Sequence, residues 1–544
     1  MTLSISAADR SAAFAIKYRW PLLIGGALLL GLTVIFPQIG WLEWIALTPA
    51  MLVILSRLPD PTVRCRRLYG MGFVFFLAFY VVNFYWLLCL YPLDFAGMEK
   101  GAAVFVVLVA WLGLSAFQAA GAALIFPLFG WLTRGKYLSR MPWVSPFLFA
   151  ALWTVWEWFQ AHSGWAGVPW ARLPLGQANL TLTLQSAAYF GSYFITFLLV
   201  AVNGLLAYVL LHPHRRWVCL SVAGGLFLGN LALGGLRLLT MPEDEGEPLT
   251  IAAIQGNISS HDDYALGAVT AAKEVYGDLS REAAAAGADV ILWPETALVL
   301  NLDTSPKTRA FVSDLAVECG VPILVGAFTS VPDSGQLYNS IVAVLPDGSI
   351  HDTVYNKQNP VPFGEFVPYR DLVMKIAPPL AEIAMLAEDI PAGEDSVVFV
   401  LDEGRLGSII CFDSIYEDNT LRSVRNGAEV LCVSTNDSWF RDSRGVWMHE
   451  AQSQLRAIET GRYVVRAAIT GVSCVITPTG EITDELPPYV RGYAMDEVYL
   501  REESTLYTLT GNVFVVLCAA FILGWTAAAA WDLRRSCEKK VKNT

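Results

Sequence analysis

Eight apolar runs, each close to the length that crosses a membrane, constrain this chain more than any other feature. The hydrocarbon core of a bilayer takes about 20 apolar helical residues to cross. Of the 544 residues 55% are hydrophobic and only 16% are charged, which is too apolar for an ordinary soluble protein. We therefore predict a polytopic α-helical membrane domain of about eight spans, at residues 21–37, 41–56, 70–91, 102–132, 143–160, 181–211, 217–239 and 511–531.

Arginine and lysine residues gather in alternate connections between these runs. They precede the first run, follow the second, fourth and sixth, and recur after the eighth: Arg10, Lys17, Arg19, Arg57, Arg64, Arg66, Arg67, Arg134, Lys136, Arg140, Arg215, Arg216, Arg534, Arg535, Lys539, Lys540 and Lys542. Short loops rich in these residues stay on the cytoplasmic side. If all eight runs span, the long segment between the seventh and the eighth lies outside the cytoplasm.

The distribution of polar residues predicts three domains. Residues 1–240 hold seven apolar runs, residues 241–503 have the polarity of a globular protein, and residues 504–544 hold the last run and a basic tail. In the middle segment, strands rich in valine and isoleucine alternate with helical patterns such as Gly267–Ala286. Strands that are apolar throughout are buried on both faces, so we predict an α/β domain in which helices cover the sheets.

Three reactive side chains fall at or after the ends of predicted strands in this domain. Glu295 closes ILWPE, Cys411 closes GSIIC, and Lys357 lies in the proline-rich loop YNKQNPVPFGEFVP. In layered α/β folds, functional groups gather at the carboxyl ends of strands. A carboxylate can take the proton of a thiol while an ammonium stabilises the thiolate and an oxyanion, so the set fits acyl transfer. Taken alone, Cys411 is better explained as an inert core residue.

The sequence shows no metal-ligand spacing and no glycine-rich phosphate loop, so no metal or other cofactor is expected. His449 and the other histidines are interpreted as structural residues for the same reason. The stretch Val373–Ala387 is apolar for a loop between Lys357 and Cys411. It is either a lid that contacts lipid or a helix that covers the core.

The WPE motif, the K-x-x-x-x-P-x-x-E pattern of Lys357–Glu365 and a cysteine after an apolar strand, in this order, resemble the carbon–nitrogen hydrolase (nitrilase) superfamily. With seven spans before it and one after it, the whole chain resembles the apolipoprotein N-acyltransferase family. The resemblance implies an αββα sandwich outside the cytoplasm. It also implies a catalytic triad in which Glu295 is the base, Lys357 stabilises the oxyanion and Cys411 is the nucleophile.

The same resemblance implies roles for neighbouring residues. Glu365 would orient Lys357. Phe412 and Asp413 stand where the family usually has tyrosine and glutamate, which leaves Asp413 as a supporting acid and Phe412 beside the substrate. Asn436 and Trp439, in the segment NDSWF, would line the pocket. A turn residue and a core residue are the alternatives for these two.

The resemblance implies transfer of an acyl chain from a phospholipid, through a Cys thioester, to the N-terminal amine of a diacylglyceryl-cysteine apolipoprotein. The expected partners are that phospholipid, that apolipoprotein and the membrane, with no nucleic acid. The expected location is the bacterial inner membrane, with the catalytic domain in the periplasm. Two other classes remain open: a membrane-fused nitrilase-type amidase that passes the thioester to water, and a non-enzymatic membrane or transport protein. The spans carry few ionisable groups, which disfavours transport.

Overall fold

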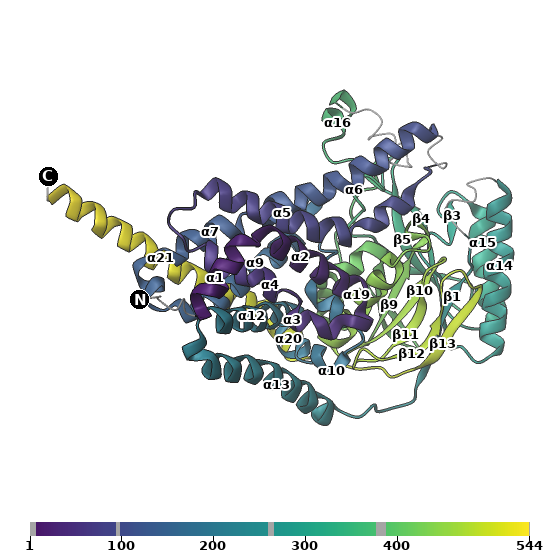
Figure 1. The fold of residues 1–544 in the computed structure, drawn as a ribbon. Helices are drawn as coiled ribbons and strands as arrows, with labels where there is room; N and C mark the ends of the chain where they lie inside the picture. The colour runs from purple at the N-terminus through teal and green to yellow at the C-terminus, as the bar shows by residue number, and fades with distance from the viewer. Residues whose placement is uncertain (1–6, 94–97, 259–265, 377–387, 543–544) are drawn as a thin grey trace. The chain divides into compact units, whose positions relative to one another are not determined.

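The computed structural model describes residues 7–93, 98–258, 266–376 and 388–542 and divides the chain into two compact units. The first unit comprises Met1–Tyr85, Val109–Thr240 and Thr510–Thr544, and the second comprises Trp86–Leu108 and Met241–Leu509. Figure 1 shows the helices and strands along the chain. The second unit is therefore built from two separate stretches of sequence, one of which precedes most of the apolar helices.

The described residues of the first unit form helices and no strand. A further helix, α6 (Lys100–Ala122), begins in the second unit and continues in the first. The α-helices of the first unit are α1 (Ala7–Lys17), α2 (Arg19–Ile35), α3 (Glu43–Ala46), α4 (Thr48–Arg57), α5 (Cys65–Asn83), α7 (Ile125–Thr133), α8 (Lys136–Arg140), α9 (Ser145–Ala161), α10 (Thr181–Leu184), α11 (Ala187–Phe190), α12 (Ser192–Leu211), α13 (Arg216–Thr240) and α21 (Val513–Lys542).

Several of these helices can cross a membrane, as the sequence predicts. Considering the described residues, six helical segments are long and apolar enough, and a seventh is added if the bent pair of α1 and α2 counts as one span. The six are Pro37–Arg57, Cys65–Asn83, Lys100–Thr133, Ser192–Leu211, Pro213–Thr240 and Val513–Asp532. The total of eight spans stays a prediction. The run predicted at 181–211 is interrupted at Gly191, whose φ of 75° ends α11 before α12 begins.

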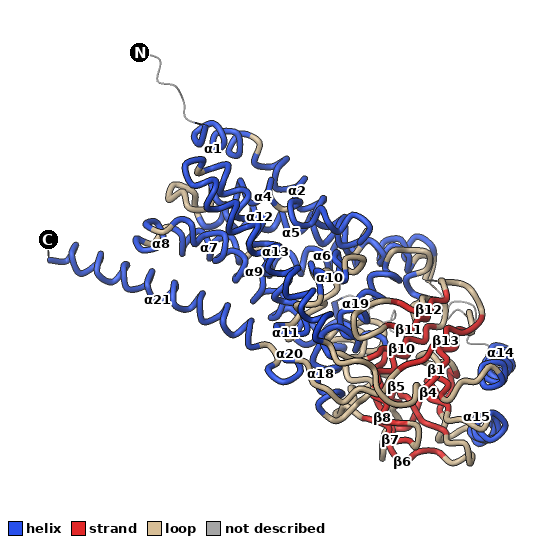
Figure 2. Tube along the Cα trace, turned by 90° about the horizontal axis from the view of Figure 1, so that it is seen from below, coloured by secondary structure: helices blue, strands red, loops and turns tan. Residues whose placement is uncertain are grey.

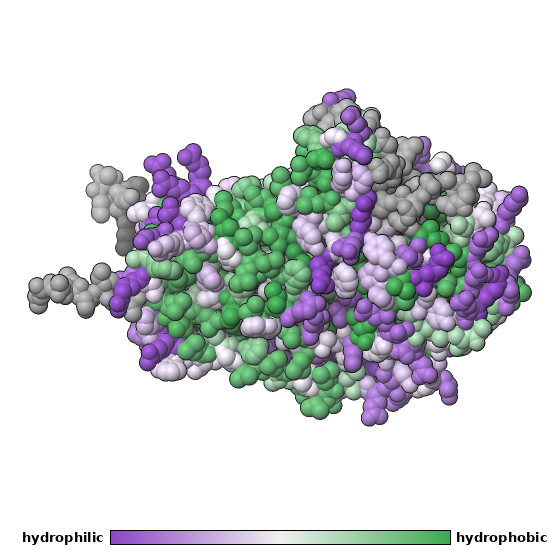
Figure 3. Space-filling model, turned by 45° about the vertical axis from the view of Figure 1, so that its right-hand side comes forward, coloured by the Kyte–Doolittle hydropathy of each residue, from purple (hydrophilic) through white to green (hydrophobic). Residues whose placement is uncertain are grey.

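Large apolar side chains face outward on the helices of the first unit. Figure 3 shows this surface as a broad hydrophobic area. Exposed apolar area in water costs about 25 cal/mol per Å² relative to burial, so a surface of this kind is suited to lipid. The outward side chains include Leu112, Phe117, Trp217, Val218, Leu228, Leu236, Val516, Leu517 and Leu523.

Two carboxylates are buried inside the first unit. Glu43 accepts a hydrogen bond from Nε2 of Gln177 at 2.7 Å, and Glu157 accepts one from Oγ1 of Thr196 at 2.6 Å. Both glutamates are almost completely shielded from solvent. Because buried carboxylates need hydrogen-bond partners, these contacts join distant parts of the helical unit.

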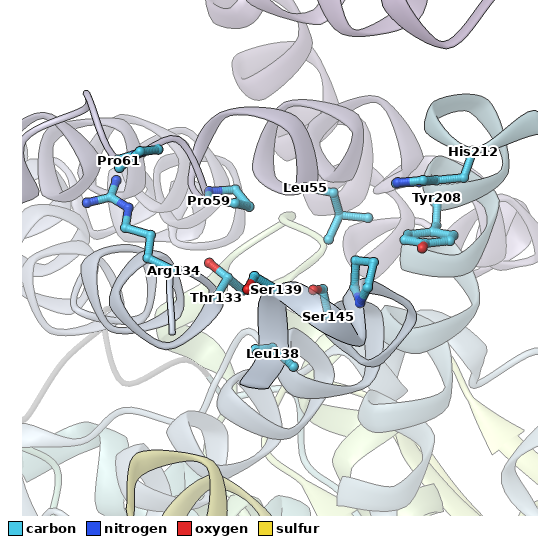
Figure 4. Close-up of a pocket in the computed structure, with 11 residues that line it drawn as sticks. Leu55, Pro59, Pro61, Thr133, Arg134, Leu138, Ser139, Ser145, Tyr208 and His212 are labelled. Carbon is cyan, nitrogen blue, oxygen red and sulfur yellow. The ribbon is translucent and has the colours of Figure 1, made fainter. Parts of the chain in front are cut away.

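The first unit also contains a cavity of about 420 Å³ (Figure 4). Of the described residues that line it, none carries a carboxylate or a thiol. The cavity therefore lacks the groups of the predicted acyl-transfer set. The lining residues are Leu55, Pro59, Pro61, Thr133, Arg134, Leu138, Ser139, Pro142, Ser145, Tyr208 and His212.

The second unit contains two β-sheets, drawn in red in Figure 2. The first has the strand order β13-β1-β2-β4-β5-β6, with β3 paired to β4, and the second has the order β12-β11-β10-β9-β8-β7. The strands are β1 (Leu249–Gln255), β2 (Val290–Leu292), β3 (Leu298–Asn301), β4 (Ile323–Ser330), β5 (Leu337–Val344), β6 (Ile350–Asn356), β7 (Val398–Leu401), β8 (Gly404–Ile410), β9 (Val430–Thr435), β10 (Tyr463–Ala468), β11 (Ser473–Ile476), β12 (Ile482–Leu486) and β13 (Gly492–Val498).

Helices cover the outer face of each sheet. The first sheet is covered by α14 and α15, and the second by α18 and α19. The helices of this unit are α14 (Leu266–Ala285), α15 (Pro306–Cys319), α16 (Arg370–Ile376), α18 (Glu417–Arg425), α19 (Gly445–Thr460) and α20 (Leu506–Thr510), with short 3₁₀ helices η2 (Tyr85–Leu90), η8 (Cys411–Ile415) and η9 (Ser438–Phe440).

Alternation along β1 shows why its central residues, Ile251–Ile254, are all apolar. Ile251 and Ala253 belong to the core between the sheets, where they join Ile410 and Val465 of the second sheet. Ala252 and Ile254 belong to the core under α14 and α15. Successive side chains of a strand point to opposite faces, so a strand in the middle of four layers must be apolar on both. The predicted αββα sandwich is confirmed.

Candidate active site

The three predicted reactive side chains each follow a strand of the sandwich. Glu295 lies just beyond β2 and Lys357 just beyond β6, both in the first sheet, whereas Cys411 follows β8 of the second sheet. Pro294 has no N–H for a sheet ladder and ends β2. A Cβ at Gly326 of β4 would lie 2.1 Å from the carbonyl oxygen of Pro294, so only glycine allows this close approach.

Lys357 is held between two carboxylates. Its Nζ lies 2.7 Å from Oε1 of Glu295 and 2.8 Å from Oε2 of Glu365, and its side chain is 1% exposed. Burial lowers the pKa of Lys357, but the negative charges of Glu295 and Glu365 outweigh burial and raise that pKa to well above its ordinary value. Lys357 is therefore a fixed positive charge at any physiological pH.

Asn339 of β5 connects the two glutamates. Its side-chain Nδ2 donates to Oε1 of Glu295 and to Oε1 of Glu365, each at 2.8 Å. Its backbone carbonyl accepts from the backbone N–H of Lys357 at 2.9 Å. Asn339 was not among the site residues predicted from the sequence. A detectable signal was present, because an amide in the otherwise apolar strand YNSIVAV needs polar partners once it is buried.

Glu295 is also held from the second sheet. Its Oε2 accepts the backbone N–H of Asn436 at 2.9 Å, directly after β9. The side-chain Oδ1 of Asn436 accepts from the backbone N–H and the hydroxyl of Ser438, at 3.2 and 2.6 Å. Asn436, predicted to bind substrate, thus contacts the predicted base through its main chain. Trp439 lies in η9 and is half-buried.

Cys411 is the first residue of η8 and is 8% exposed. Burial raises the pKa of its thiol far above the ordinary value, and the carboxylate of Glu295 raises it further, whereas the ammonium of Lys357 opposes the shift. The charges of Glu295 and Lys357 therefore act on the thiol in opposite directions. In the resting protein the thiol is neutral, so it has to lose its proton to become a nucleophile.

Asp413 supports the loop that carries Lys357. Its Oδ1 accepts the backbone N–H of Asn359 at 2.7 Å, and its Oδ2 accepts the hydroxyl of Tyr355 at 2.8 Å. These partners flank Lys357 on both sides in sequence, which agrees with a supporting role. Phe412 packs edge-on against Tyr416, with ring centroids 5.5 Å apart.

The possible lid at Val373–Ala387 is described only at its start, where Val373–Ile376 belongs to α16. Residues 377–387 lie outside the described residues, and the two interpretations of this stretch stay predictions.

We expect Cys411 to resist alkylation at neutral pH. Thiolates react with iodoacetamide and thiols do not, so the raised pKa makes Cys411 slow, and its rate keeps rising above about pH 9, where an ordinary thiol of pKa near 8.5 levels off. Cys65, which is exposed, serves as the comparison within the same chain. Peptide mass spectrometry over a pH series measures both rates. A Cys411 rate that levels off near pH 8.5 would contradict a resting neutral thiol.

Two family models match this chain. "Apolipoprotein N-acyltransferase N-terminal domain" matches residues 26–205, and "Carbon-nitrogen hydrolase" matches residues 250–503. An apolipoprotein N-acyltransferase of Gloeobacter violaceus is 33% identical over 503 residues, 92% of each chain. One of Geobacter metallireducens is 30% identical over 520 residues, 93% of this chain and 94% of that one. An amidase of Nesterenkonia from the nitrilase superfamily is 16% identical, covers 50% of this chain and 97% of its own, and has a TM-score of 0.38.

Proposed function

The chain belongs to the apolipoprotein N-acyltransferase family, and from this premise we propose that it moves an acyl chain from a phospholipid, through a thioester on Cys411, to the N-terminal amine of a diacylglyceryl-cysteine apolipoprotein. It is an N-acyltransferase enzyme and a membrane protein, and its second unit has the nitrilase-superfamily fold. The observation that carries the proposed chemistry is the buried cluster in which Lys357 pairs with Glu295 and Glu365 beside the neutral thiol of Cys411.

In the first half-reaction, Glu295 takes the proton from Sγ of Cys411 as the sulfur attacks the carbonyl carbon of the phospholipid ester. Nζ of Lys357 stabilises the oxyanion that forms. The intermediate collapses when the bond to the glycerol oxygen breaks, and Glu295 returns the proton to that oxygen. A lysophospholipid leaves, and the acyl chain stays on Cys411 as a thioester.

In the second half-reaction, the α-amine of the apolipoprotein attacks the thioester carbon. The ordinary pKa of such an amine is about 7.7–8.0, so a modest base is sufficient to remove its proton as the carbon–nitrogen bond forms. Glu295 takes that proton and passes it to the departing sulfur, which restores the neutral thiol. Glu365 keeps Lys357 in place throughout, because its Oε2 is 2.8 Å from Nζ.

Orientation in the membrane is part of the proposal. The basic residues in alternate loops support a bacterial inner membrane protein whose residues 241–503 form a catalytic domain in the periplasm. Residues 1–240 and 504–544 would then anchor it with the basic ends in the cytoplasm. Phe412 and Trp439 are proposed to contact substrate.

The test is intact-protein mass spectrometry of the full chain in phospholipid vesicles. We expect an added acyl mass that maps to Cys411. Addition of a diacylglyceryl peptide with a free N-terminal amine should remove that mass and give an N-acylated peptide, whereas the same peptide with an acetylated amine should not. Free fatty acid as the main product, with the free-amine peptide present, would instead indicate the amidase-type hydrolase. No adduct under any condition would refute the thioester mechanism.

A further inference from the structure

A buried histidine contacts the backbone of the proposed nucleophile. His449 of α19 is 1% exposed, and its Nε2 lies 3.2 Å from the carbonyl oxygen of Cys411 and 3.2 Å from Oγ of Ser414. Oγ of Ser414 is also within hydrogen-bond distance of the same carbonyl, at 2.7 Å. The imidazole of His449, the hydroxyl of Ser414 and the carbonyl of Cys411 therefore all lie within 3.2 Å of one another.

This main chain needs support. Cys411 has a φ of 48°, a left-handed conformation that a side chain makes unfavourable by about 1–3 kcal/mol. Such a conformation persists only where surrounding contacts hold it. The conformation matters because it sets the direction in which Sγ leaves the backbone, relative to the carboxylate of Glu295.

The opposite edge of the imidazole is fixed by an ion pair. Nδ1 of His449 lies 2.8 Å from Oδ1 of Asp437, whose Oδ2 pairs with Nη2 of Arg466 at 2.7 Å. Burial raises the pKa of Asp437, but Arg466 and His449 outweigh it and lower that pKa to about 2. Nη2 of Arg466 also lies 3.2 Å from Nδ1, but the ionised carboxylate of Asp437 is nearer, at 2.8 Å. We therefore assign the ring proton to Nδ1, which donates it to Asp437.

The ring therefore offers an acceptor to Ser414. Burial and the positive charge of Arg466 lower the pKa of His449 below its ordinary value, so near neutral pH the ring carries one proton only. With that proton on Nδ1, Nε2 is an acceptor. The hydroxyl of Ser414 has one hydrogen for two acceptors, Nε2 and the carbonyl of Cys411. Removal of any one of these three groups therefore changes the hydrogen bonding of the other two.

We propose that His449 is a positioning residue for acyl transfer, which acts through Ser414 and the Cys411 carbonyl to hold the backbone that directs the sulfur toward Glu295 and Lys357. The proposal rests on the proposed role of Cys411 as nucleophile. The competing role is a buried core residue that only keeps Asp437 and Arg466 in place. The two roles use opposite edges of the imidazole, so they can be separated.

Two substitutions separate them. Asparagine places an amide nitrogen near the position of Nδ1, so His449→Asn keeps a donor for Asp437 and loses the acceptor that faces Ser414. Glutamine places its amide near the position of Nε2, so His449→Gln keeps that acceptor and loses the donor for Asp437. The measurement is the single-turnover rate of thioester formation by the full chain in phosphatidylethanolamine–phosphatidylglycerol vesicles, with Tm recorded for each variant.

We expect His449→Gln to retain at least about tenfold more of the acylation rate than His449→Asn, because small displacements of a reacting group cost about this much or more. Equal rates, or the reverse order, would overturn the proposal, since support of Asp437 would then be the role of the ring. His351→Gln, which changes a histidine of β6, is the matched control and should react like the wild type. Absence of an adduct in the wild-type protein would count against the proposed function itself.

Ser414→Ala keeps the test decisive if the His449 variants do not accumulate. Ser414 is fully buried and short, and alanine removes only its hydroxyl. We expect the acylation rate of this variant to fall about tenfold with little change in Tm, and the loss in a Ser414→Ala, His449→Asn double variant to be smaller than the product of the single losses, since the two groups share one contact. A wild-type rate for Ser414→Ala would overturn the proposal.

Discussion

Cys411→Ala is expected to abolish the acyl-enzyme and to lower acyl transfer by about 10⁴- to 10⁶-fold, the loss that follows removal of a catalytic nucleophile. Alanine leaves Glu295 and Lys357 in place but offers no atom that can form a thioester. The substitution removes one atom at a site that is already nearly closed to solvent, so we expect the variant to fold. Mass spectrometry of the protein and quantification of N-acylated peptide measure the two effects.

Cys319→Ala is the matched control for this substitution. Cys319 ends α15, is half-buried and is a free thiol as well. We expect the control to form the adduct and to transfer acyl groups at the wild-type rate. Residual transfer by Cys411→Ala within about tenfold of the wild type would mean that the amine attacks the phospholipid directly, without a covalent intermediate.

Lys357→Met should affect both catalysis and stability. Methionine has a similar length but no charge, so Glu295 and Glu365 would face each other across Asn339 with no cation between them. Breaking a buried ion pair by removing one partner typically costs about 3–5 kcal/mol. We also expect acylation to fall by about 10³-fold, because the charge that stabilises the oxyanion is gone. Tm and the single-turnover rate of thioester formation measure the two losses.

A double variant separates these effects. Lys357→Met with Glu365→Gln removes one of the two uncompensated negative charges, so Tm should recover in part while acylation stays low. Lysine keeps its charge up to its raised pKa, so its stabilising contribution is present throughout the neutral range and is lost only as pH rises through that value. Lys307→Met, an exposed change in α15, is the control. An unchanged Tm for Lys357→Met would contradict the buried ion-pair cluster.

The sequence was informative about the sandwich because its strands are buried on both faces. The apolar runs within β1 (Ile251–Ile254) and β9 (Val430–Val433) located these strands from composition. The residues just past strand ends included all three members of the proposed triad. Hydropathy was less informative in the helical unit. It predicted one span at 181–211, although residues 181–190 form short helices before the break at Gly191. An apolar sequence does not distinguish a segment buried by protein from one that faces lipid.

Polar residues that act by hydrogen bonding were harder to predict. Asn339 has no charge and lies among apolar strand residues, so its bridge between Glu295 and Glu365 depends on a fold that brings three distant segments together. His449 lacked metal-ligand spacing and was interpreted as structural. Its contact with the Cys411 carbonyl joins residues 38 positions apart and has no local signature.

The proposed base Glu295 and cation Lys357 follow strands of one sheet, whereas the thiol of Cys411 follows a strand of the other. The proposed proton transfer therefore takes place between groups held by different sheets. A shift of one sheet relative to the other by a fraction of an ångström would separate the thiol proton of Cys411 from its acceptor, Glu295, while each sheet stays intact. Substitutions that enlarge or shorten side chains in the core between the sheets, such as Leu292 and Ile410, should therefore lower the rate of acyl transfer before they unfold the protein. In this architecture the packing between the two sheets sets the position of the thiol relative to the proposed base and cation.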